Sequence, residues 1–360
     1  MIMKYLLTNN NIINKSLDYD SIICYLNYML NKEKNKIDDY ANEWDKVKKI
    51  IHNYEYVYYS SYRKKNISII SPVSRSYFKL REMIYEYDIK FENNYNTCHL
   101  AEAPGGFIQS IIHLIEKNKI NIYANSLLSD DKSIPRWNHK ISKYKINYIY
   151  GKNNNGDLFD YLNIISMIYK IGRNKCEFVT GDGGFDFSED YSKQEYNSLR
   201  LIYNEIFLAL NIQKKNGNFI CKIFDTFLKE TIDLIYLLTL SYEKVYLHKP
   251  KISRNSNSEK YLVCLNYKGY NKKIINNMCH SFNDLKLNLK LNDLFYHNLI
   301  KYIIKYTLKQ IRSINKGINI INDKNYHIKP RNKQLNLAIK WCKKYNIGIN
   351  GRCIYLNNPS

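Results

Sequence analysis

Acidic residues are scarce in this 360-residue chain, in which 33 Asp and Glu stand against 55 Lys and Arg, for a formal net charge of +22. Such a surplus favours a polyanionic partner, and nucleic acid is the commonest one. The surplus is uneven, because Lys268 to Ser360 holds 18 Lys and Arg but 3 Asp, a net of +15. An ordinary solvated lysine-rich helical face is the alternative, but the concentration of charge favours a binding surface in 268–360.

Paired cysteines, zinc-ligand spacing and long apolar runs are missing as well. The eight cysteines form no CxxC pair, so no metal site or disulfide is expected. Those at 98, 176, 221 and 264 fall in expected strands, where a thiol acts as a small buried hydrophobe. No stretch has the layout of a signal peptide or the length of a membrane span. These absences predict a soluble, cytoplasmic protein without membrane contact.

The middle of the chain alternates between extended and helical patterns. Such alternation predicts an α/β fold with a mostly parallel seven-stranded sheet and helices on both faces. The expected strands are 95–101, 121–126, 146–150, 176–181, 218–224, 243–247 and 260–266, and the clearest helices are 105–117, 158–170, 194–214 and 227–240. Ligands of such sheets bind at the carboxyl ends of the strands.

Both ends of the chain lack this alternation. Residues 1–73 are predicted to form a helical N-terminal extension, 74–267 the α/β domain, and 268–360 a basic, mainly helical C-terminal extension. Within the last part, helical patterns cover 281–312 and 333–345. A helix with a serine cap is expected to begin near Ser74 and Ser76.

A glycine turn follows the first expected strand, in the stretch from Leu100 to Phe107. A strand, a tight turn and a helix together present free backbone N–H groups to a ligand. Gly105 and Gly106 are expected to let the backbone approach a nucleoside closely, and Pro104 forgoes a donor just ahead of the helix, where its loss costs little.

Charged residues lie at the ends of later expected strands. Asp157 follows the third strand and could accept a hydrogen bond from an adenine amino group. Asp182 follows the fourth strand, and Lys222 lies in an otherwise apolar strand. A buried lysine is costly unless it is paired or deprotonated. Lys222 is therefore either a structural ion-pair partner or, with a lowered pKa beside Asp182, a group suited to take a proton from a hydroxyl.

These residues also form a pattern of four. Lys79, Asp182, Lys222 and Glu259, in their local contexts, resemble the Lys-Asp-Lys-Glu tetrad of FtsJ-like (RrmJ-like) ribose 2′-O-methyltransferases. The turn Ala-Glu-Ala-Pro-Gly-Gly-Phe and the stretches 126–138 and 150–158 are similar to the cap-methylating, Adrift-type branch, which includes enzymes of large DNA viruses. The resemblance covers roughly 74–267.

The resemblance implies a Rossmann-like fold that uses S-adenosylmethionine to methylate a ribose 2′-hydroxyl. Asp157 would contact the adenine of the cofactor, and Asp182 would lie beside the transferred methyl group. Lys222 would orient, or also deprotonate, the hydroxyl, and Lys79 and Glu259 would complete the charge network. The methionine and ribose side of the cofactor would be lined by Glu102, Ala103, Pro104, Gly105, Gly106 and Phe107.

Two departures from the family pattern stand out. Glu102 takes the place of the first glycine of the commoner turn, as the cap-methylating branch tolerates. No acidic residue directly ends the second expected strand, where many methyltransferases bind the cofactor ribose, and Asp130 or Asp131 is the candidate substitute.

The leading hypothesis is an mRNA cap 2′-O-methyltransferase acting on the first transcribed nucleotide. Its partners would be the capped mRNA 5′ end and other capping or transcription subunits, and a viral factory or virion would be an additional location. A methylated guanine could stack on aromatic rings, with Tyr77, Trp137 and Phe185 as candidates. The alternatives are a ribosomal or transfer RNA 2′-O-methyltransferase and a noncatalytic RNA-binding scaffold.

Overall fold

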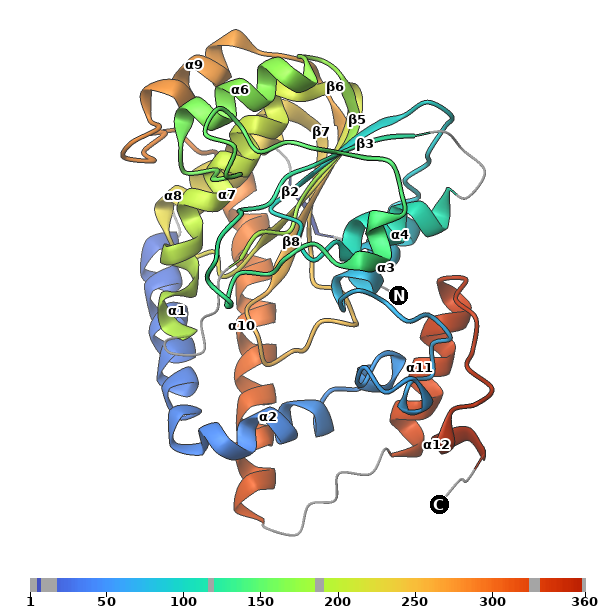
Figure 1. Cartoon of the computed structure of the whole chain (residues 1–360). Coiled ribbons are helices and arrows are strands. Elements are labelled where there is room, and N and C mark those ends of the chain that lie inside the picture. Colours follow the sequence, from blue (N-terminus) through green and yellow to red (C-terminus); the bar gives the residue numbers. More distant parts are fainter. Residues whose placement is uncertain (1–4, 8–17, 116–119, 185–190, 324–330, 358–360) are drawn as a thin grey trace.

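An eight-stranded mixed sheet lies at the centre of the computed structural model, which describes residues 5–7, 18–115, 120–184, 191–323 and 331–357 (Figure 1). Its order is β1-β7-β8-β6-β5-β2-β3-β4. The strands are β1 (Tyr5–Leu7), β2 (Asn96–Leu100), β3 (Asn121–Ala124), β4 (Ile146–Tyr148), β5 (Cys176–Gly181), β6 (Gln213–Ile223), β7 (Tyr242–His248) and β8 (Lys260–Tyr267). All seven expected strands are therefore confirmed, and β1 is an addition from the N-terminal extension.

The sheet is parallel on one side and antiparallel on the other. Strands β4, β3, β2, β5 and β6 are parallel neighbours. Strand β8 inserts between β6 and β7 and pairs antiparallel with both. Because β8 runs against β6, the loop 249–259 that precedes it ends beside the carboxyl end of β6.

Helices cover both faces of the sheet, as expected. The helices are α1 (Tyr19–Asn35), α2 (Ala41–Ile50), α3 (Ser76–Glu86), α4 (Gly106–Leu114), α5 (His139–Ser142), α6 (Tyr161–Ile171), α7 (Gln194–Ile212), α8 (Lys229–Ser241), α9 (Lys272–His280), α10 (Asp293–Asn322), α11 (Asn332–Lys344) and α12 (Ile354–Asn357). Figure 1 shows α3 and α4 on one side of the strands and α6, α7 and α8 on the other. None of the helices in the described ranges is both long and apolar enough to span a membrane.

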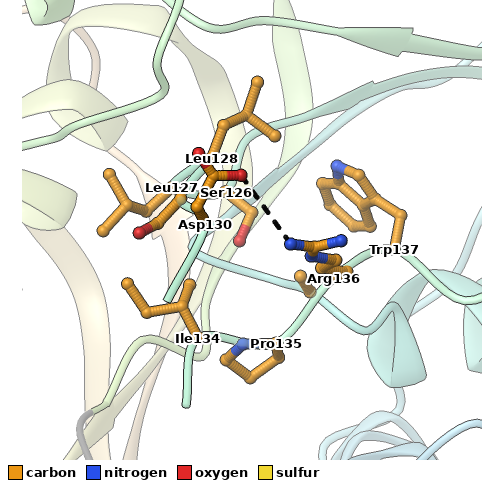
Figure 2. A pocket seen from close by; sticks show the side chains of 10 residues that line it. Ser126, Leu127, Leu128, Asp130, Ile134, Pro135, Arg136 and Trp137 are labelled. Atoms are coloured by element: carbon orange, nitrogen blue, oxygen red, sulfur yellow. Dashed lines mark ion pairs between the residues drawn. The ribbon is translucent and has the colours of Figure 1, made fainter. Parts of the chain in front are cut away.

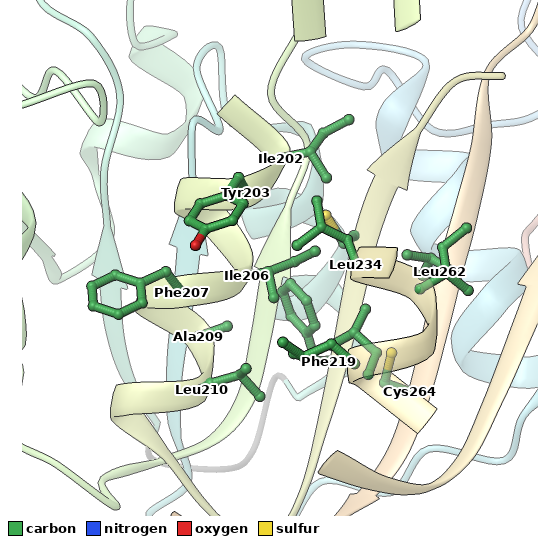
Figure 3. Packing of buried hydrophobic residues seen from close by; sticks show 14 of the residues in the cluster. Ile202, Tyr203, Ile206, Phe207, Ala209, Leu210, Phe219, Leu234, Leu262 and Cys264 are labelled. Atoms are coloured by element: carbon green, nitrogen blue, oxygen red, sulfur yellow. The ribbon is translucent and has the colours of Figure 1, made fainter. Parts of the chain in front are cut away.

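Strand residues alternate between two cores, as the two-residue period of a strand requires. In β8, Leu262 and Cys264 pack against α7 and α8, whereas Tyr261 and Val263 pack against α3 and α4. Figure 3 shows the first of these cores, where side chains of α7 meet Phe219 of β6 and Leu234 of α8. The expected burial of the four strand cysteines is confirmed, and all eight cysteines are free thiols.

The C-terminal extension is part of the core. Phe295, Leu299 and Tyr302 of α10 are fully buried in the cluster that also holds α7 and α8. Trp341 of α11 packs against α3 and donates from its indole nitrogen to the buried Glu82 carboxylate at 2.8 Å. Removal of 268–360 would therefore expose this core and is expected to unfold the protein. Weaker RNA binding by such a truncated protein would not show that these residues contact RNA.

Two local expectations are wrong. The expected helix 281–312 is not continuous: residues 281–292 are irregular, and α10 starts only at Asp293. Leu285 and Asn288 have φ angles of 62° and 48°, which a right-handed helix cannot contain. The expected serine cap of α3 is also absent, because Ser74 and Ser76 Oγ atoms bond each other at 2.5 Å and Arg75 precedes the helix without a side-chain cap.

Candidate active site

The glycine turn joins β2 to α4 through the buried residue Glu102. The Glu102 carboxylate accepts the Phe107 N–H at 2.6 Å and so closes the N-terminus of α4, where negative charge is favoured. Burial and the neighbouring charge of Asp182 raise the pKa of Glu102 well above its usual value. Its second oxygen, Oε2, is buried without a hydrogen-bond partner among the described residues.

The turn has a left-handed residue and two closely packed glycines. Ala101, with φ of 48°, adopts the left-handed conformation that the commoner turn gives to glycine, and Glu102 does not. The space that a Cβ on Gly105 or Gly106 would need is filled by Ile141 and by the hydroxyls of Ser74 and Ser76. Close packing within the chain therefore requires these two glycines, and the approach of this backbone to a nucleoside stays a prediction.

The four tetrad residues form two ion pairs at the carboxyl ends of the central strands β5 and β6. Lys79 of α3 contacts Glu259 with 2.6 Å between Nζ and Oε2. Lys222 Nζ donates to the Asp182 backbone carbonyl at 2.6 Å and lies 3.5 Å from Asp182 Oδ1. All four side chains are largely buried, with 12–14% of each exposed. Residues 180 positions apart in sequence thus meet at the carboxyl ends of β5 and β6.

The pKa of Lys222 is raised, contrary to the expectation of a lysine with a lowered pKa. Burial alone would lower the pKa of Lys222, but the charges of Asp182, Glu259 and Glu205 outweigh burial and raise that pKa above its usual value. Lys222 is therefore an ammonium ion, not a lysine of lowered pKa. Burial opposes ionisation of Glu259, yet Lys79 and Lys222 lower its pKa to about 2.

Two further groups support Asp182, and the motif pattern did not identify either. The Tyr261 hydroxyl donates to Asp182 Oδ1 at 3.0 Å from β8. Glu205 of α7 is fully buried and accepts the Gly183 N–H at 3.1 Å, and burial raises its pKa to about 8. Strand alternation could have flagged Tyr261, which is two residues from Glu259, but nothing in the sequence signals Glu205.

Replacement of Tyr261 by phenylalanine is expected to lower kcat about tenfold, because a hydrogen bond to a charged group contributes about 1.5 kcal/mol or more. Affinity for S-adenosylmethionine should change little. Tyr267→Phe is the matched control, since this residue of the same strand loses a comparable buried bond, to the Leu210 carbonyl, away from the tetrad. Equal initial rates for the two variants would contradict a positioning role for Tyr261.

A cavity of about 540 Å³ adjoins the turn (Figure 2). It is lined by Ala103, Ser126, Leu127, Leu128, Ser129, Asp130, Ile134, Pro135, Arg136 and Trp137. Figure 2 shows Asp130 paired with Arg136, at 3.9 Å, beside the Trp137 ring. Of the two candidate acids after β3, Asp130 lines the cavity, whereas Asp131 accepts the N–H of Ser133. The residue directly after the strand is Asn125, whose side-chain amide donates to the Ile149 and Gly156 carbonyls.

Of the residues predicted to bind the cofactor, one lines this cavity and the others do not. Ala103 lines it, whereas Phe107 is fully buried and packs against Tyr261. Asp157 is next to Gly156, which packs against the Ser126 carbonyl, and one Asp157 carboxylate oxygen accepts the Phe159 N–H at 2.8 Å. Their roles towards a cofactor remain predictions.

The expected stacking residues differ in availability. Tyr77 is 1% exposed and bonds His113 Nδ1 at 3.1 Å, so it cannot stack on a guanine. Trp137 lines the cavity, with its indole N–H donated to the Tyr150 hydroxyl. Phe185 lies outside the described residues. No cluster of His, Cys, Asp and Glu suited to a metal ion occurs in the part of the chain that the structure describes.

Buried charges tie the N-terminal extension to the tetrad loop. Asp225, after β6, contacts Lys34 of α1 at 2.7 Å and Lys260 of β8 at 3.1 Å. It also accepts the Ser258 hydroxyl at 2.7 Å. Ser258 precedes Glu259, so α1 helps to hold the loop that carries a tetrad residue.

Comparison with known proteins agrees with the fold and the motifs. The model of the FtsJ-like methyltransferase family matches residues 72–267. Since this span is more than half of the chain, the protein belongs to the FtsJ-like methyltransferase family. The family resemblance drawn from the tetrad and the turn is thereby confirmed, and the resemblance to enzymes of large DNA viruses stays a prediction.

Curated relatives are cap-specific mRNA (nucleoside-2′-O-)-methyltransferases. Methyltransferase 2 of this name from Drosophila melanogaster is 31% identical over 264 residues, and the match covers 67% of this chain and 36% of the relative. Methyltransferase 1 from Caenorhabditis elegans is 38% identical over 139 residues, and the match covers 38% of this chain and 15% of the relative. Number 1 of Trypanosoma cruzi is 32% identical over 168 residues, covering 46% of each. The chain thus spans less than half the length of these relatives.

Proposed function

We propose that this chain transfers a methyl group from S-adenosylmethionine to the ribose 2′-hydroxyl of the first transcribed nucleotide of capped mRNA. The observation that carries the proposal is the pair of buried ion pairs, Lys79–Glu259 and Asp182–Lys222, beside the turn of a methyltransferase fold. The cap-specific names of the relatives support an mRNA substrate.

The residues around the turn fit S-adenosylmethionine. The cavity has the size of small-molecule sites and combines apolar walls with the Asp130 carboxylate. The buried Glu102 Oε2, which has no partner among the described residues, is available to a polar ligand group. When bound, the cofactor supplies a methyl group already activated by its sulfonium, so the protein contributes position and hydroxyl activation.

Lys222 would hold the 2′ oxygen as an ammonium ion. One of its three N–H donors is used by the Asp182 carbonyl, which leaves others for the substrate oxygen. The 2′ oxygen would gain the methyl carbon while its proton passes to solvent water, and the electron pair of the broken carbon–sulfur bond would remain on the cofactor sulfur. The fixed positive charge of Lys222 would stabilise the negative charge that develops on the oxygen. Lys79 and Glu259 would keep the position and charge of Lys222 fixed.

An ammonium role predicts a flat pH profile. Because the pKa of Lys222 is raised, its protonation does not change between about pH 7 and 9, so Lys222 itself should not cause a tenfold rise of kcat per pH unit in that range. The measurement is kcat at saturating cofactor and RNA, with cofactor affinity determined at each pH. A rise of about tenfold per pH unit would instead indicate that neutral Lys222 acts as a base.

Cap dependence tests the proposal directly. Tritiated S-adenosylmethionine is incubated with otherwise identical short RNAs that are uncapped, guanosine-capped or N7-methylguanosine-capped. Label should enter the capped RNAs, and prior 2′-O-methylation of the first nucleotide should block it. Cap-independent labelling would overturn an mRNA-cap substrate, and label at the second nucleotide would move the assignment. No labelling of any RNA would favour a noncatalytic scaffold.

A further inference from the structure

Helix α10 carries a one-sided row of cations, which we call the α10 stripe. At about 100° per residue its members fall within an arc of about 80°. All are exposed, on the side opposite the buried Phe295, Leu299 and Ile314. The α10 stripe consists of Lys301, Lys305, Lys309, Arg312 and Lys316.

The α10 stripe costs the free helix stability. Lysines 301 and 305, lysines 305 and 309, and Arg312 and Lys316 are like-charged neighbours four residues apart, each pair destabilising by about 0.2–0.5 kcal/mol. The helix has one acidic residue, Asp293, in its first turn. Desolvation and the charges of Lys305 and Lys251 lower the pKa of Lys309. An ordinary solvated helix face intersperses acids, so this row has the composition of an anion-binding surface.

The α10 stripe borders the tetrad loop at one of its members, Lys309. Gln310, adjacent to Lys309, donates to the Ser258 hydroxyl at 3.2 Å, and Ser258 precedes Glu259. Lys309 also borders a recess with Asn257 and Lys249. Lys249 in turn donates to the Glu259 carbonyl at 2.8 Å. Figure 1 shows α10 continuing from there past α2. Arg312 and Lys316 lie on that part of the helix, whereas Lys301 and Lys305 precede the contact with the tetrad loop.

We propose that the α10 stripe binds the phosphates of the RNA strand that extends beyond the methylated nucleotide. This inference rests on the proposed function, which places the strand's first ribose at the tetrad. From Lys301 to Lys316 the helix rises about 22 Å, enough to follow several nucleotides of a single strand. Phosphate contacts of this kind fix position without reading sequence. Continuity with the tetrad favours this RNA over an anionic membrane or an acidic protein.

A charge-matched pair of variants tests the α10 stripe. Lys305→Gln/Lys309→Gln/Arg312→Gln removes three stripe charges with a good helix former. The control, Lys170→Gln/Lys272→Gln/Lys273→Gln, removes three exposed charges from α6 and α9. Binding is measured by fluorescence anisotropy for capped RNAs of about 25 and about 3 nucleotides over a salt series, and methylation KM is measured in parallel.

For the longer RNA, the stripe variant should bind at least about tenfold more weakly, and its slope of log affinity against log salt should fall by about 2. The 3-nucleotide RNA and the control should behave like wild type. Equal loss in both variants, or no loss in the stripe variant, would overturn the inference. If the wild type methylates neither RNA, the proposed function fails, while the binding comparison still decides the role of the stripe.

Discussion

Replacing Lys222 by alanine is expected to lower kcat by at least about a thousandfold while leaving the affinity for S-adenosylmethionine nearly unchanged. The side chain contacts Asp182 and faces the proposed position of the 2′ oxygen, so its loss removes a contact to the reacting group rather than to the adenosine cavity. Turnover is followed with tritiated cofactor, and cofactor binding by calorimetry.

Two controls accompany the Lys222 variant. Lys215→Ala removes an exposed lysine from the same strand and should keep wild-type kcat. Lys222→Met fills the space without the charge, and a thermal melt of each variant shows whether the uncompensated carboxylates have unfolded the site. A folded Lys222→Ala protein that loses cofactor affinity, or that turns over like wild type, would show that the proposed role of Lys222 is wrong.

Replacing Asp225 by alanine should destabilise the protein by about 3–5 kcal/mol, because two buried lysines lose their counter-ion. Asp225 is 4% exposed and contacts Lys34 and Lys260. Asp45→Ala is the control, since that carboxylate pairs with Lys48 on the surface and should contribute no more than about 1 kcal/mol. The free energy of unfolding of both variants is measured in urea. Equal unfolding midpoints for Asp225→Ala and Asp45→Ala would show that the buried ion pairs of Asp225 do not stabilise the fold.

The lowered pKa of Asp225 predicts that the protein loses stability in acid. Burial opposes ionisation of Asp225, but Lys34 and Lys260 lower its pKa far below the usual value near 4. A lowered pKa contributes stability above the unfolded-state pKa, and this contribution disappears as the pH falls below about 4. Wild type should therefore lose more stability than Asp225→Ala between about pH 5 and 3.

The central fold was predictable because its signals are local. Apolar runs such as Phe219–Cys221 are typical of buried strands, and the turn residues between them mark their ends. The segment 281–292 was not predictable by period alone. Leu287, Leu289 and Leu291 alternate with polar residues at a period of two, while Leu285 and Asn288 adopt positive φ angles that the sequence does not signal. Strand β1 depends on a partner more than 230 residues away.

The tetrad was predictable because its four residues recur in recognisable local contexts. The raised pKa of Lys222 was not, since it depends on how closely folding brings the Asp182, Glu259 and Glu205 carboxyls to this buried side chain. The same holds for the ties between the extensions and the site. Glu55 accepts Arg254 at 2.6 Å across 199 positions, and Gln310 reaches Ser258 from α10. Such contacts follow from tertiary packing and leave no periodic pattern.

Strand β1 has a consequence for the solution behaviour of the protein. Three backbone positions, Tyr5 to Leu7, pair antiparallel with Leu247 to Val245 and so occupy the free side of β7. An unpaired strand there would be a template on which a second molecule could continue the sheet. Strand β1 thus takes the edge position of the sheet itself, and its three residues offer a second molecule fewer backbone groups to pair with than the seven residues of β7 would.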